Sequence, residues 1–248
     1  MSVLKAERIK LFSTRSPWWC AGIAVVATLG FTALFFSLSG GEIVPTVANT
    51  QIASAQGRTV VLVLAVLAAA SEFNWGTMRM TFQAVPSRTP ALLAKGAVVG
   101  TLSAAIGLIV GVGCWGLATL IKPDADLALH TAADWRIVFG QVLTFLLTGL
   151  LGVGLGLLLR GVGLTLGIAL VWTQLVEGLV LFIPTVGDDI HQWMPFYAAS
   201  QFAGADLGAG PLKLGAPPLG PIGYGVYFAI ICLGFFAAGV VINLRRDS

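Results

Sequence analysis

Charge, cysteine and histidine are all scarce in this chain of 248 residues, which is 10% charged and holds 3 Cys and 2 His. A soluble domain carries about a quarter charged residues, so the composition excludes an ordinary soluble protein. Cys20, Cys114 and Cys232 have no close spacing and predict neither a disulfide framework nor a metal site. The sequence lacks a G-x-x-x-x-G-K-[ST] phosphate loop and a convergent set of catalytic residue types, so we expect neither ATP hydrolysis nor another enzyme activity.

Apolar residues are abundant instead, at 57% of the chain with a mean hydropathy of +0.91. A helix crosses the bilayer core of about 30 Å with roughly 20 apolar residues, and the runs lack the alternation of barrel strands. The sequence therefore predicts an all-α integral membrane protein, a single domain over 1–248. The predicted spans are 17–38, 58–71, 90–121, 135–159, 161–183 and 221–244.

The distribution of Lys and Arg predicts the orientation of these spans. Ten cations fall in segments that share one side with the N-terminus, and four fall on the other side. Both termini are therefore expected in the cytoplasm, with an interfacial helix over 1–16, an internal loop over 72–95 and an external or re-entrant segment over 184–220. A signal peptide is not expected, because the first apolar run is long and has no clear cleavage site. The inner cations are Lys5, Arg8, Lys10, Arg15, Arg79, Arg88, Lys95, Arg160, Arg245 and Arg246.

The internal loop has a local pattern of its own. Asn74 is a candidate N-cap, and Met78, Phe82 and Val85 follow at helical spacing, which predicts a short helix with one apolar stripe. Pro86 would end this helix, and Thr89 before Pro90 suits the start of the next span. The competing interpretation is that these residues only anchor helix ends at the lipid headgroups.

Two segments resemble the membrane subunits of bacterial ABC-2 type exporters. The first, ERIKLFSTRSPW, fits the pattern E-x-x-K-L-x-S-T-R-S-x-W, and the second fits E-[FY]-x-x-G-T followed by P-x-R-x-x-x-L-x-A-K. Together they cover roughly the first hundred residues, and the remainder matches only in its layout. The matching positions are Glu7, Lys10, Leu11, Ser13, Thr14, Arg15, Ser16, Trp18, Glu72, Phe73, Gly76, Thr77, Pro86, Arg88, Leu92, Ala94 and Lys95.

The resemblance implies a permease subunit in the cell inner or plasma membrane that exports an apolar or amphipathic substrate such as a drug, antibiotic or lipid. Its partners would be a separate ATP-binding subunit in two copies, a second permease subunit and membrane lipid, but no nucleic acid. ATP and magnesium would be bound by the partner, and this chain would hold no cofactor. A secondary carrier, another polytopic protein, and a sensor or immunity factor of the same architecture stay as alternatives. The residues implied in coupling to the ATPase are Glu72, Gly76, Thr77, Met78, Arg79, Phe82 and Arg88.

One carboxylate, Glu177, falls inside a predicted span, where acids are costly and are typical of functional sites. Thr173 and Gln174 share its helix face, so the three residues are candidates for a polar part of the transport pathway. The alternative is that Glu177 forms a structural ion pair with Arg58 or Arg136. A separate prediction concerns the second span, which begins at Arg58: the Arg58 side chain is expected to extend from the end of that helix toward the headgroups.

Small residues and the external segment complete the predictions. Glycines four residues apart predict close helix contacts, within one subunit or between two. His130 and His191 lie near acids, but without a ligand set that predicts a metal site. Aromatic residues over 193–197 suggest an interfacial belt, a short re-entrant helix or a lid. The glycine pairs are Gly96 and Gly100, Gly107 and Gly111, Gly152 and Gly156, and Gly163 and Gly167.

Overall fold

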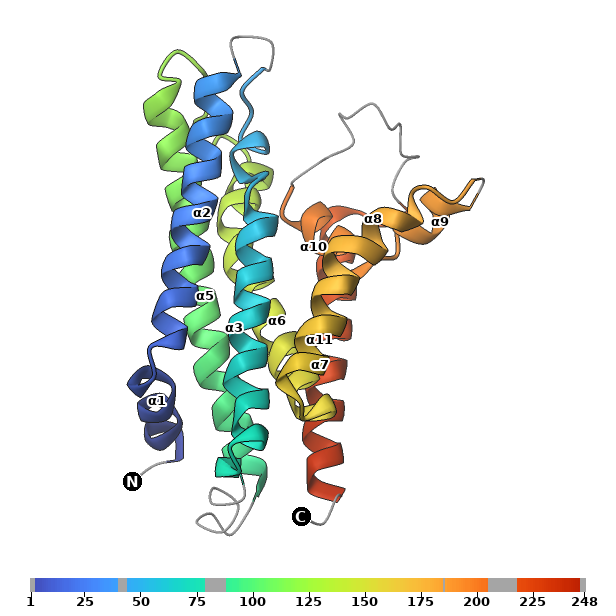
Figure 1. Ribbon diagram of the computed structural model, residues 1–248. Helices are drawn as coiled ribbons and strands as arrows, with labels where there is room; N and C mark the ends of the chain where they lie inside the picture. Colours follow the sequence, from blue (N-terminus) through green and yellow to red (C-terminus); the bar gives the residue numbers. More distant parts are fainter. Residues whose placement is uncertain (1–2, 40–43, 79–87, 185, 205–217, 246–248) are drawn as a thin grey trace.

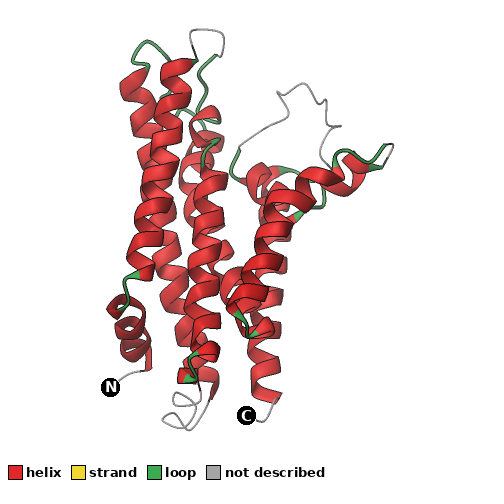
Figure 2. Ribbon diagram, viewed as in Figure 1, coloured by secondary structure: helices red, strands yellow, loops and turns green. Residues whose placement is uncertain are grey.

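The computed structural model describes residues 3–39, 44–78, 88–184, 186–204 and 218–245, and its regular structure there is helical (Figure 2). Within these ranges six helical segments are long and apolar enough to cross a membrane. This confirms the predicted multi-pass, all-α architecture. The spans are α2 (Ser16–Leu38), η1 with α3 (Asn49–Gln51, Ser54–Asn74), α5 (Arg88–Ile121), α6 (Ala132–Leu159), α7 with η2 and α8 (Val162–Val171, Trp172–Val176, Glu177–Val180) and α11 (Pro221–Arg245).

Helix α6 is the centre of the bundle and contacts α3, α5 and α11. It starts at a capping box in which Thr131 and Asp134 exchange side-chain to backbone hydrogen bonds, which satisfies otherwise free amides at the helix start. It ends at Arg160, whose φ of 57° is left-handed and terminates the helix. An apolar helix with partners on three sides fixes the positions of the others.

Close packing around α6 depends on glycine. A Cβ on Gly152 would lie 2.6 Å from Cβ of Ala65, and one on Gly107 would lie 2.7 Å from the Gln141 carbonyl oxygen. Gly111 and Gly156 make equally close approaches, so these two predicted pairs are contacts within the chain. Gly163 and Gly167 differ, since among the described residues nothing lies within 4 Å of a Cβ at either position.

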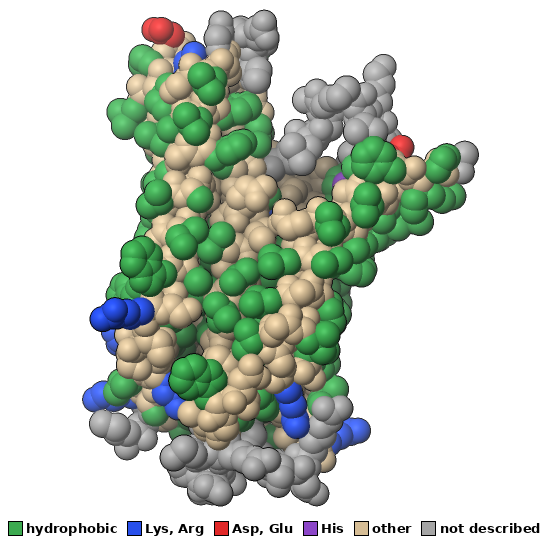
Figure 3. All heavy atoms as spheres, viewed as in Figure 1, with side chains coloured by type: hydrophobic (Ala, Val, Ile, Leu, Met, Phe, Trp, Pro, Cys, Tyr) green, Lys and Arg blue, Asp and Glu red, His purple; other side chains and the backbone are tan. Residues whose placement is uncertain are grey.

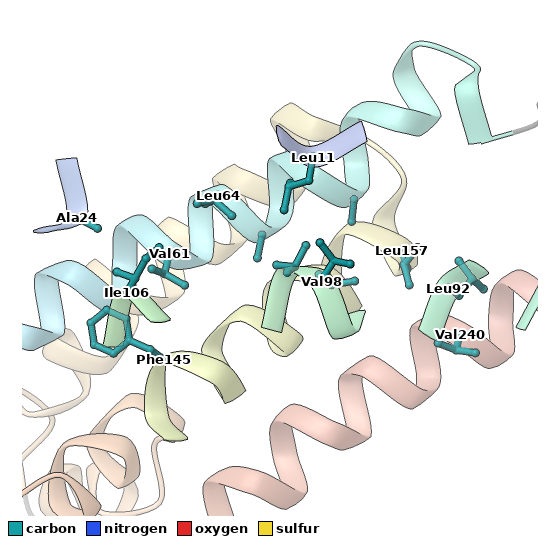
Figure 4. Packing of buried hydrophobic residues seen from close by; sticks show 14 of the residues in the cluster. Leu11, Ala24, Val61, Leu64, Leu92, Val98, Ile106, Phe145, Leu157 and Val240 are labelled. Atoms are coloured by element: carbon teal, nitrogen blue, oxygen red, sulfur yellow. The ribbon is translucent and has the colours of Figure 1, made fainter. Parts of the chain in front are cut away.

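The main hydrophobic core lies between α2, α3, α5 and α6, and it includes the N-terminal helix α1 (Val3–Ser13). Figure 4 shows Leu11 of α1 beside Leu64 of α3 and Val98 of α5. Burying a leucine contributes on the order of 1.5–3 kcal/mol. The helix α1 is therefore docked on the bundle, and not only held at a headgroup surface.

Both chain ends lie at one end of the bundle, called the terminal end below, and the opposite end is the far end (Figure 1). The visible Lys and Arg side chains gather mainly at the terminal end (Figure 3). Two short helices lie at the far end: α9 (Gly187–His191) extends outward beyond α8, and α10 (Pro195–Phe202) packs beside the end of α11 (Figure 1). The predicted segment 184–220 thus contains short helices where the structure describes it.

Three predictions about the spans and their ends are wrong. Helix α3 begins at Ser54, so Arg58 lies a full turn inside it and is 1% exposed, where the prediction had it reaching the headgroups. Asn74 ends α3 and does not cap a new helix. Gly76, with φ of +70°, follows as the turn residue. Thr89 lies inside α5, which is already helical at Arg88.

Candidate functional site

The terminal end holds a cluster of four charged side chains, called the ion cluster below: Glu7, Lys10, Glu72 and Lys95. Glu7, Glu72 and Lys95 are largely buried, and Lys10 is 38% exposed at its edge. The Lys95 ammonium lies 2.7 Å from Glu7 Oε2 and 2.6 Å from Glu72 Oε1. Lys10 lies 3.0 Å from Glu7 Oε1 and 3.5 Å from Glu72 Oε1. Two acids and two bases leave the cluster neutral, which is what burial in an apolar bundle requires.

The ion cluster joins three elements that are distant in the chain. Glu7 is on α1, Glu72 is in the last turn of α3, and Lys95 is in the second turn of α5. The side chains of Glu7 and Lys95 are 4% and 6% exposed, so solvent screens their attraction little. Burial by itself raises the pKa of Glu7, but the charges of Lys95 and Lys10 outweigh it and hold this pKa below 4.5. Glu7 is therefore ionised at neutral pH.

A second polar link lies at the same end. The Arg160 guanidinium is 5.3 Å from the Phe73 ring centroid, and its Nη2 donates to Asn243 Oδ1 at 2.8 Å. The buried Asn243 amide donates in turn to the carbonyls of Leu157 and Gly239. These contacts connect the ends of α3, α6 and α11. Together with the ion cluster, these contacts hold α1, α3, α5, α6 and α11 together at the end of the bundle where residues 79–87 connect α3 to α5.

The residues predicted to couple to an ATPase divide into three groups. Glu72 lies in the last turn of α3, Gly76 lies in the turn that follows, and Thr77 begins a new helical segment, where its hydroxyl donates to the Glu72 carbonyl at 3.3 Å. Met78 is 3% exposed and packs in the main core, so its side chain does not form an exposed apolar contact as the predicted stripe required, and the other stripe residues, Phe82 and Val85, lie outside the described residues. Arg79 and Phe82 lie outside the described residues, and only the backbone of Arg88 is described, as the start of α5.

Sequence reasoning did not single out Trp75, which is the most exposed aromatic residue near this turn, at 82%. It lines a cavity of about 540 Å³ together with Glu72, Lys95 and residues of α1. Exposed tryptophans are enriched at protein interfaces and at headgroup level. Its position three residues after Glu72, an acid of the matched motif, was the available signal.

Glu177 lies at the far end and binds backbone amides. Its Oε1 accepts from Phe196 N–H at 3.0 Å and from Trp172 Nε1 at 3.3 Å, and its Oε2 accepts from Tyr197 N–H at 3.2 Å. These amides belong to the first turn of α10, whose free N–H groups favour an anion. The carboxylate therefore anchors α10 to the fifth span.

Neither predicted ion pair of Glu177 forms. Arg136 instead donates to the Phe202 carbonyl and stacks on the Phe202 ring. Arg58 donates from Nη2 to Ser200 Oγ at 2.8 Å, and within the described ranges it has no carboxylate within 4.0 Å. Arg58 and Glu177 nevertheless line one cavity.

The three predicted pathway residues come together as expected from their helix face. Thr173, Gln174 and Glu177 line the same cavity of about 200 Å³ between the fifth span, α3 and α10. Gln174 Nε2 donates to Thr59 Oγ1 at 3.0 Å. A π-helical turn over Trp172–Val176 sets their direction, and such turns are frequent at functional sites.

The two histidines do not share a site in the described structure. His130 lies 3.1 Å from Asp126 in an exposed pair, and His191 packs against the Tyr197 ring. No group of three or more His, Cys, Asp and Glu side chains with metal-binding geometry occurs in the part of the chain described.

No protein-family model matches this chain, and no curated protein matches it either.

Proposed function

We propose that this chain is the membrane-spanning permease subunit of an exporter driven by a separate ATP-hydrolysing subunit. The observation that supports this function most is the ion cluster. Its charge pairs connect α1, α3 and α5, and they lie where the loop between the second and third spans leaves α3 and enters α5. A displacement of that loop by the ATPase subunit would therefore move α1, α3 and α5 together. Transmission of a conformational change into the membrane bundle requires such a rigid connection.

The proposed orientation puts the terminal end in the cytoplasm, where the excess of Lys and Arg favours it. The ATPase would then bind this end in two copies, and a second permease subunit would complete the pathway. The apolar surface of the spans suits an apolar or amphipathic substrate. ATP and magnesium belong to the partner in this proposal.

The contact with the partner involves Trp75 in place of Met78. Trp75 is exposed beside the turn at Gly76, whereas Met78 is buried in the core. An aromatic anchor of this kind is a frequent centre of binding energy at protein interfaces. Residues 79–87 follow Trp75 after three intervening residues and belong to the same predicted loop.

The test is purification of the native assembly from membranes in a mild nonionic detergent. We expect a nucleotide-hydrolysing subunit to co-purify with the wild type and to be lost with Trp75→Asp. Trp19→Asp is the matched control, because Trp19 is 70% exposed on the side of α2. An assembly without such a subunit, active in transport on an ion gradient, would instead indicate a secondary carrier. If the nucleotide-hydrolysing subunit co-purifies equally with Trp75→Asp and Trp19→Asp, Trp75 does not contribute to the interface.

A further inference from the structure

The polar cavity at the far end, called the far cavity below, combines features of a binding site. Its volume is about 200 Å³, and its lining includes Arg58, Thr173, Gln174, Glu177, Tyr197 and Ser200. These residues come from α3, from the π-turn and α8, and from α10. Figure 3 shows the surface hollowed between the long helices and the α8–α10 region at this end. A polar hollow in a chain with 10% charged residues needs an explanation.

Arg58 is the charged group with unpaired donors in this cavity, where Nδ1 of the His191 ring is also buried without a hydrogen-bond partner among the described residues. Arg58 is 1% exposed, and one nitrogen, Nη2, binds Ser200. Its Nε and Nη1 are buried and have no hydrogen-bond partner among the described residues. A buried guanidinium has five N–H donors, and leaving charged donors unpaired costs more than leaving neutral ones unpaired. The free donors call for an acceptor that carries negative charge.

The other ionisable groups of the cavity do not supply that acceptor. Glu177 has both oxygens occupied by the amides of α10 and the Trp172 indole. Burial lowers the pKa of His191 below 6.5, against the attraction of Asp188, so this ring is neutral at pH 7 and brings no second cation. The cavity therefore has one positive group with unmet donors and one carboxylate, Glu177, which attracts Arg58 but gives it no hydrogen bond, because its oxygens accept from α10 and from Trp172.

The size of the cavity limits what can fill it. Drug-sized ligands need roughly 300–1,000 Å³, so a cavity of about 200 Å³ takes only the polar end of such a molecule. Ala55, Gln56 and Gln174 are the exposed members of its lining. An apolar tail can leave past them along the outer surface of the fifth span, which is only 17% buried.

We propose that the far cavity binds the oxyanion head, a carboxylate or a phosphate, of an amphiphilic molecule, with Arg58 as the binding residue. Ser200 holds the guanidinium, and Thr173 and Gln174 offer further polar contacts to the head. This inference deepens the proposed function and rests on it for the view that the bound amphiphile is a transported one. Binding itself is tested without the ATPase.

The experiment measures saturable binding of radiolabelled dodecanoate to the full chain purified in a maltoside detergent, after subtraction of uptake by protein-free micelles. Unlabelled dodecyl phosphate should compete, because it carries the same kind of head. Dodecanol should not compete, because it has no charge. Loss of the charged hydrogen bonds in Arg58→Gln should weaken binding by about tenfold to a hundredfold. Arg136→Gln, which removes the other far-end arginine from outside the cavity, should bind as the wild type does.

A second pair of variants covers the case in which Arg58→Gln fails to fold. Gln174 is exposed, so substitutions there are expected to be tolerated in folding. Gln174→Glu and Gln174→Leu both lose the hydrogen bond that Gln174 Nε2 donates to Thr59 Oγ1, but only Gln174→Glu adds a carboxylate. We expect at least tenfold weaker binding for Gln174→Glu than for Gln174→Leu. Equal binding by these two variants, or competition by dodecanol, would overturn the proposal.

Inorganic phosphate distinguishes a free anion from an amphiphile. If it competes as strongly as dodecyl phosphate, the site takes the anion alone and the amphiphile is refuted. Weak competition by inorganic phosphate supports the tail's contribution. If dodecanoate binds as expected while no ATPase co-purifies with the chain, the far cavity stands and the proposed exporter function fails.

Discussion

Removing the Lys95 ammonium is the sharpest perturbation of the ion cluster. Lys95→Met keeps an apolar stem of similar length but leaves the Glu7 and Glu72 carboxylates facing each other. Both were within 2.7 Å of the ammonium, and the side chains of Glu7 and Lys95 are 4% and 6% exposed. Removing one partner of such a buried pair costs about 3–5 kcal/mol. Because Lys10 still pairs with both acids, we expect about 3 kcal/mol.

For a chain of this length each kcal/mol lowers the melting temperature by about 2–4 °C, so Tm should fall by about 6–12 °C. The assay is thermal unfolding of the detergent-purified protein, followed by tryptophan fluorescence. Lys122→Met is the matched control, since Lys122 follows the other end of α5 and forms no ion pair within the described ranges. Its Tm should change by less than about 2 °C, as for other surface substitutions.

A double-mutant cycle separates charge pairing from a loss of packing. In a Glu7→Gln background the site has one carboxylate fewer, so Lys95→Met should cost at least about 1 kcal/mol less than it does alone. If the two substitutions are additive, or if Lys95→Met leaves Tm within about 2 °C of the wild type, the ion cluster does not hold the three helices together. The proposed force path would then lose its main support.

Three further predictions concern packing, α10 and pH. Gly152→Ala should lower the free energy of unfolding by about 1–3 kcal/mol, measured by thermal unfolding, because the new Cβ would overlap Ala65. Gly167→Ala is the control, since nothing in the described structure lies within 4 Å of a Cβ there, and it should be neutral or stabilising. Glu177→Gln should weaken the attachment of α10 to the fifth span by about 1–3 kcal/mol, since the new amide NH₂ would face the backbone donors of Phe196 and Tyr197. Proteolytic cleavage within 195–202 should then become faster, and an unchanged rate would contradict this role of Glu177. Because the pKa of Glu7 is held below 4.5, its contribution is fully present above about pH 4.5 and is lost as the pH falls through the lowered value. The Tm difference between wild type and Glu7→Gln should therefore shrink on acidification, and a constant difference would count against an ionised Glu7.

The predicted layout agrees with the structure where a single physical length controls it. Each span is recognised because a bilayer core needs about 20 apolar residues, and this requirement is local. The helix ends were less accurate, since Ser54 and Asn74 extend α3 beyond the predicted 58–71. Polar residues near a helix end carry no signal of whether other parts of the chain will cover them. Arg58 is the clearest example, since it is 1% exposed and its Nη2 binds Ser200, which lies 142 residues away in the sequence.

Hydropathy and residue chemistry alone determined that this chain is a multi-pass helical membrane protein with a polar turn between its second and third spans. The position of Glu177 inside a span also selected it as a residue to examine, whereas Glu72 was selected by the resemblance to exporter permeases. Only the tertiary structure decided that Lys95 meets Glu7 and Glu72, which are 88 and 23 residues away, and that Glu177 holds α10 while Arg58 keeps free donors. Such pairings depend on the rotation and depth of each helix in the bundle. Those are set by contacts such as Gly152 against Ala65, which join segments distant in the sequence.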